Sequence, residues 1–92
     1  MKIAVDVCVG DRGTAILRDA GHEVIEAAHC ESDRDWCARA LAAGVEMFVS
    51  ADADIEIYAY DVDVRFFQAR QRDSGIVTAQ RVLAQISGRT LR

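Results

Sequence analysis

The stretch Ile3-Ala4-Val5-Asp6-Val7-Cys8-Val9 decides the fold, because it is almost continuously apolar and rich in β-branched residues. A short run of this kind is typical of a strand covered on both faces, as the central strands of a parallel sheet are. Gly10-Asp11 is expected to end the strand. One acid, Asp6, interrupts the run near its carboxyl end, where an unpaired carboxylate is costly to bury. We therefore expect a central parallel strand that carries a functional acid.

Helix and strand patterns alternate along the rest of the chain. Apolar stripes at helical spacing that run from capping side chains to a glycine indicate helices, and short β-branched runs indicate strands. Residues 52–60 fit either a strand or a short helix. The other expected elements are a helix over 14–20 closed by Gly21, a strand over 24–28, a helix from the capping pair Ser32-Asp33 to Gly44, a strand over 45–50, an edge strand over 61–66 with one wet face, and a last helix from the capping pair Asp73-Ser74 to Gly88.

This alternation predicts an α/β three-layer sandwich, with a small, mainly parallel four-stranded sheet in the order 2-1-3-4. Residues 1–92 are expected to form a single domain, because no linker, repeat or low-complexity stretch divides them. Ligands of such sheets bind outside the carboxyl ends of the strands, where the strand order reverses. The crevice is therefore predicted between the first and third strands.

Composition and charge restrict the possible functions. The net charge of −4 and the pI near 5.0 do not suit a protein that grips nucleic acid through a broad basic face, but they do suit carboxylates that hold a divalent cation. No apolar run approaches the roughly 20 residues of a membrane helix, so we expect a cytoplasmic protein with no membrane contact. The odd set of Cys8, Cys30 and Cys37 lacks CxxC spacing and indicates neither disulfides nor a zinc site; Cys8 is expected to be a small buried side chain of the first strand.

Acids lie at both strand ends that border the predicted crevice. Asp6 lies near the end of the first strand, and Asp52 and Asp54 directly follow the third. Carboxylates brought together repel one another unless a cation compensates, and a few hard oxygen ligands suit Mg²⁺ or Mn²⁺. Structural roles are the alternative: Asp6 could accept backbone hydrogen bonds, while Asp52 and Asp54 could cap the following turn.

The ordered motifs of the chain resemble those of the short PIN-like proteins, a family of metal-dependent nucleases that includes many toxins. The first strand carries Ala4-Val5-Asp6, and Gly21-His22-Glu23-Val24 leads into the second. Ser32-Asp33-Arg34-Asp35 begins a helix, and Val49-Ser50-Ala51-Asp52-Ala53-Asp54-Ile55 follows later. The likeness spans almost the whole chain, at similar spacings. No single motif is specific, but the ordered combination is moderately so.

The resemblance implies that Asp6, Asp52 and Asp54 are metal-binding and catalytic acids, with Asp33 at a further acidic position. From the residues alone, Asp33 also fits an N-cap. The implied function is a Mg²⁺- or Mn²⁺-dependent ribonuclease acting on RNA, and the toxin of a toxin–antitoxin pair with a cognate antitoxin protein as partner.

The chain also departs from the family pattern. Val7 and Cys8 replace a glutamate and an asparagine, and Ala51 and Ala53 replace an arginine and a lysine. The alternative is therefore a catalytically degenerate PIN-like module that acts in protein–protein interaction. Its exposed edge strand could also form a homodimer.

Overall fold

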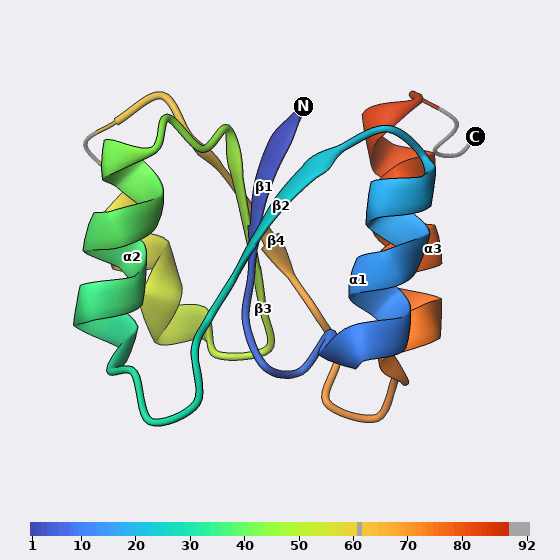
Figure 1. The fold of residues 1–92 in the computed structure, drawn as a ribbon, viewed down its shortest axis with the longest axis horizontal. Helices are drawn as coiled ribbons and strands as arrows, with labels where there is room; N and C mark the ends of the chain where they lie inside the picture. The colour runs from blue at the N-terminus through green and yellow to red at the C-terminus, as the bar shows by residue number, and fades with distance from the viewer. Residues whose placement is uncertain (61, 89–92) are drawn as a thin grey trace.

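The computed structural model describes residues 1–60 and 62–88. Within them, strands and helices alternate along the chain (Figure 1). The elements are β1 (Lys2–Val5), α1 (Gly10–Asp19), β2 (Glu23–Glu26), α2 (Asp33–Ala42), β3 (Met47–Ser50), the 3-10 helix η1 (Ala53–Ala59), β4 (Arg65–Gln68) and α3 (Gly75–Ile86).

The predicted strand order is confirmed. The four strands form one sheet in the order β2-β1-β3-β4, and all three neighbouring pairs are parallel. Because the pairs are parallel, the carboxyl ends of the strands lie along one edge of the sheet, at the bottom of Figure 1. No helix of the described ranges has the length and apolarity to cross a membrane.

Helices cover both faces of the sheet, as Figure 1 shows. Alternate side chains of β1 and β3 point to opposite faces, as the strand period of two requires. Ile3 and Val49 pack toward α1 and α3, while Ala4 and Phe48 pack toward α2 and η1. The ring of Phe48 meets that of Trp36 edge to face, with the ring centroids 5.6 Å apart, and both side chains are fully buried.

The first strand is shorter than predicted. It ends at Val5, and a turn follows in which the Val9 N–H donates to the Asp6 carbonyl at 3.1 Å. The Val7 N–H also donates to the Asp6 carboxylate, a local side chain–backbone hydrogen bond that competes with strand pairing. Val7 is 72% exposed and Cys8 is half-buried, so Cys8 is a turn residue rather than a strand residue. Helix α1 accordingly begins at Gly10, four residues before its predicted start.

The last strand was also predicted incorrectly. The strand spans Arg65–Gln68 instead of the predicted 61–66, and position Asp61 of that prediction lies outside the described residues. Its wet face is absent, because Phe66 packs toward α2 and η1 while Phe67 packs toward α1 and α3. Both aromatic rings are half-buried because helices cover the two sides of the sheet even at this edge.

Candidate active site

Asp6 and Asp52 lie at the carboxyl ends of adjacent strands. Asp6 directly follows β1, and its N–H donates to the carbonyl of Val49 in β3 at 2.9 Å. Asp52 comes two residues after the end of β3. The two acids line one hollow of about 490 Å³ at the edge of the sheet, so the crevice lies where the strand order predicts it.

Ser50 links the two acids. Its hydroxyl donates to Asp6 Oδ2 at 2.7 Å and accepts from the Asp52 N–H at 3.0 Å, while the Val7 N–H donates to Asp6 Oδ1 at 2.7 Å. Ser50 is fully buried. Sequence reasoning did not select this residue, although a serine closing an otherwise apolar strand is a visible signal. The Asp6 carboxylate is thus fixed in orientation by hydrogen bonds to both oxygens.

Asp33, at the start of α2, lines a second groove that adjoins the crevice at Asp52. It is the first residue of the helix, but the N-cap is Ser32, whose hydroxyl accepts from the Asp35 N–H at 3.1 Å. The capping role considered for Asp33 is therefore wrong, and its carboxylate is left free of that role. Its pKa is raised by desolvation and then by the negative charges of Asp6 and Asp52. Carboxylates from three separate segments consequently repel one another here.

Asp54 lies on the other side of Asp52, in η1. Its N–H donates to Asp52 Oδ1 at 2.9 Å, so Asp52 caps the 3-10 helix. This is the structural role that was the alternative to metal binding for Asp52. Asp54 does not line the hollow beside Asp6; it lines a second groove together with Asp33 and Asp52. The structure therefore places Asp52 between the two hollows and Asp54 in only one of them.

The acids suit a hard divalent cation by ligand type, although they form no closed cage. Over residues 1–60 and 62–88 there is no group of three or more His, Cys, Asp or Glu side chains placed to hold a metal. Mg²⁺ needs fewer, since it often binds through one or two carboxylates and keeps several waters. Asp6 and Asp52 match that minimal donor set. A bound cation would also reduce the repulsion that the negative charges of Asp6 and Asp52 exert on Asp33.

Polar side chains from the end of β4 and the turn that follows it complete the hollow. Gln68 and Gln71 line it with the two acids, and Arg70 lines an adjoining hollow with the same glutamines. Cys8 also lines the hollow, and burial raises the pKa of its thiol, which keeps it protonated. Amides and a guanidinium can hydrogen-bond a phosphate or a base. Sequence reasoning missed the glutamines, and no local pattern marks them.

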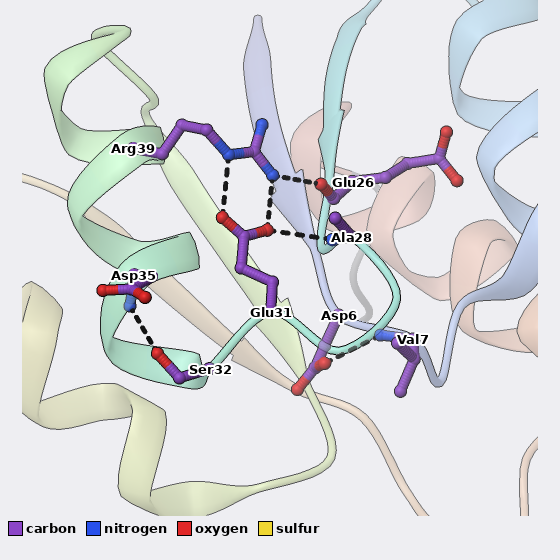
Figure 2. Close-up of polar contacts among 8 residues, drawn as sticks. All are labelled: Asp6, Val7, Glu26, Ala28, Glu31, Ser32, Asp35 and Arg39. Atoms are coloured by element: carbon purple, nitrogen blue, oxygen red, sulfur yellow. Dashed lines mark hydrogen bonds and ion pairs between the residues drawn. The ribbon is translucent and has the colours of Figure 1, made fainter.

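An ion pair fixes the loop between β2 and α2 (Figure 2). Arg39 Nε and Nη2 donate to the two carboxylate oxygens of Glu31 at 3.0 and 2.7 Å, and Nη2 also donates to the Glu26 carbonyl at 2.7 Å. The Ala28 N–H donates to Glu31 at 2.9 Å. The hydrogen bonds from Arg39, then that from Ala28, lower the pKa of Glu31 to about 2. The contacts tie the end of β2, the loop and α2 together, and so set where α2 begins.

Comparisons of the chain with protein-family models, with curated proteins and with solved structures found no match. The functional assignment therefore depends on the geometry and chemistry of the crevice.

Proposed function

We propose that the chain is a PIN-like, Mg²⁺- or Mn²⁺-dependent phosphodiesterase that cleaves RNA. The observation that carries this proposal is the meeting of Asp6 and Asp52 at one crevice, from the ends of adjacent strands, while Asp33 lines the adjoining groove and its pKa is raised in part by their charges. The cost of bringing like charges together is difficult to explain by stability alone, because perturbed carboxylates in a cleft are a feature of functional sites.

Each residue of the crevice has a distinct role in this proposal. Asp6 and Asp52 would hold the ion, with Asp6 oriented by the Ser50 hydroxyl. A bound Mg²⁺ or Mn²⁺ would supply a Lewis acid that activates a water near neutral pH. Asp33, whose pKa is raised by desolvation and then by the charges of Asp6 and Asp52, lines the adjoining groove, from which it would accept the proton of that water. Arg70 lies beside the hollow, where a guanidinium would neutralise a phosphate.

Titration with Mn²⁺, with binding measured by electron paramagnetic resonance, tests the metal site. We expect the parent to bind the ion and Asp6→Asn and Asp52→Asn to bind at least roughly tenfold more weakly, because each change removes a charged ligand. Asp19→Asn is the matched control, since this exposed acid at the end of α1 lies outside both hollows. No binding by the parent would refute the proposal.

Cleavage of a fluorogenic single-stranded RNA in Mn²⁺ tests the reaction itself. We expect activity from the parent and the control, and a loss of at least about 100-fold in the two crevice variants. Equal activity in parent and Asp6→Asn preparations would identify a contaminating nuclease and reject the assignment.

A second candidate function is a catalytically degenerate PIN-like module that binds a partner protein. It is favoured by the lack of a three-ligand metal group in the part of the chain that the structure describes, and by Val7, Ala51 and Ala53 at positions where the family has polar residues. A parent protein that folds but binds no Mn²⁺ would select this function.

A further inference from the structure

A second groove runs beside the crevice, along η1. It has a volume of about 630 Å³, and we call it the η1 groove. Asp52 and Ala53 belong to both the crevice and the groove, but the remaining lining is separate. The η1 groove is lined by Asp33, Asp52, Ala53, Asp54, Ile55, Glu56, Ile57, Tyr58 and Tyr60.

Large apolar side chains of this groove are left without packing partners. Ile57 is 72% exposed and Tyr60 is 82% exposed, whereas Ile55 and Ala59 of the same segment are buried against α2 and the sheet. The buried pair anchors η1, so the exposed pair is held in place instead of folding inward. A 3-10 helix of seven residues is also unusually long, since runs beyond three or four residues are uncommon. The segment thus presents a fixed apolar surface to solvent.

The charges around this surface are all negative. Asp33, Asp52, Asp54 and Glu56 line the groove, and no lysine or arginine is among its lining residues in the described chain. Four carboxylates repel a phosphate backbone, which makes the groove a poor path for RNA. They equally repel a second copy of the chain, whose same face would carry the same charges. A cationic partner is the occupant that this surface favours.

We propose that the η1 groove binds a short basic segment of a partner protein, in which apolar residues alternate with arginine or lysine. The apolar residues would cover Ile57 and Tyr60, and the cations would pair with the carboxylates on the rim. Tyr58 and Tyr60 add ring faces on which a guanidinium can stack. This inference rests on the partner-binding candidate above and names the chemistry of the partner. It does not depend on metal binding.

Three designed eight-residue peptides probe the groove, each with blocked termini. One alternates arginine with leucine, one alternates glutamate with leucine, and one alternates arginine with serine. Binding is measured by fluorescence anisotropy in a buffer that contains EDTA, and mapped by amide chemical shifts of the full chain. We expect the arginine–leucine peptide to bind at least roughly tenfold more tightly than the other two, since it alone supplies both charge and apolar surface. Its shifts should concentrate on residues 52–60.

Substitutions separate the apolar from the ionic contribution. Ile57→Ser and Glu56→Gln should each weaken binding of the arginine–leucine peptide about three- to tenfold. Val7→Ser is the matched apolar control, because Val7 is also 72% exposed but lines the crevice. Asp19→Asn is the charge control. Both controls should bind as the parent does.

Several results would overturn the inference. They are equal binding of the three peptides, shifts located away from residues 52–60, and controls that weaken binding as much as Ile57→Ser. Amide shifts confined to residues 54–60 on addition of a single-stranded RNA in the absence of peptide would show that the groove accepts phosphate and would overturn it too. Because EDTA removes divalent ions, failure here is separate from failure of the nuclease proposal, which the Mn²⁺ titration decides.

Discussion

Gly75→Ala should destabilise the fold, because the amino end of α3 touches the turn that follows β1. A Cβ built on Gly75 would lie 1.8 Å from the carbonyl oxygen of Val9 and 2.7 Å from its carbon. Real Cβ contacts essentially never fall under 3.0 Å, so the two segments must separate by at least 1.2 Å, the difference between 3.0 and 1.8 Å. The obstacle is backbone and cannot rotate away, as the end of a flexible side chain could.

The expected cost follows from two opposing effects. Overpacking of this kind costs about 1–3 kcal/mol, and we take the upper end because backbone must move. Replacing glycine by alanine in a helix returns up to about 1 kcal/mol through helix propensity. The free energy of unfolding should therefore fall by roughly 2 kcal/mol, which for a domain of this size lowers Tm by roughly 8–16 °C.

Urea unfolding followed by circular dichroism and by Trp36 fluorescence measures the change. Gln80→Ala, also in α3, is the control, because this exposed position gains helix propensity without a clash and should stay within about 0.5 kcal/mol of the parent. A Gly75→Ala protein as stable as the parent would refute the close approach of α3 to Val9.

Three further measurements test the site and its surroundings. Hydrogen bonding to Arg39 lowers the pKa of Glu31 from 4.5 to about 2, so their pairing stabilises the fold fully above pH 4.5, and this stabilisation is lost as the pH falls toward 2. The urea midpoints of the parent and Glu31→Gln should therefore differ at pH 7 and converge near pH 2. A difference that does not change with pH would contradict this. Burial raises the pKa of Cys37 to about 12, so Ellman's reagent at pH 8 should label exposed Cys30 at once and Cys37 only on unfolding; equal rates in the native protein would count against the core assignment. Ser50→Ala leaves buried polar partners unpaired and should cost about 1–3 kcal/mol of stability and about 10–100-fold in Mn²⁺ affinity, whereas unchanged values would remove Ser50 from the site.

The order of elements was predictable because its signals are local. Glycines mark the helix ends, and Gly21 and Gly44 indeed follow α1 and α2 with φ of 95° and 82°. The ends of β1 and β4 were not predictable in the same way. Strand β1 stops early because the Asp6 carboxylate bonds the Val7 N–H, and the position of β4 is set by its pairing with β3, where Ser50 lies opposite Gln68. Such choices depend on contacts that apolar patterning does not encode.

The residues of the candidate site likewise differ in how far the sequence predicts their positions. Asp6 and Asp52 were predictable, because parallel topology alone places the ends of adjacent strands together. The position of Asp33 was not, because Ser32 and Asp33 are both good capping residues and the sequence does not say which one caps. That choice is fixed by a loop whose geometry depends on Arg39, eight residues after Glu31.

Both candidate functions start from the repulsion among neighbouring carboxylates, and they differ in which bound cation reduces that repulsion. Asp33 and Asp52 line the η1 groove, and their charges also act on the crevice beside Asp6. A small hydrated cation would relieve the repulsion at the Asp6–Asp52 hollow and would leave exposed Ile57 unexplained. A basic peptide segment would reduce the repulsion from the η1 groove and would explain the exposure of Ile57. It would not explain why the Ser50 hydroxyl orients the Asp6 carboxylate. Each proposed function accounts for a feature that the other leaves aside, so we propose that the two sites adjoin each other and share Asp52.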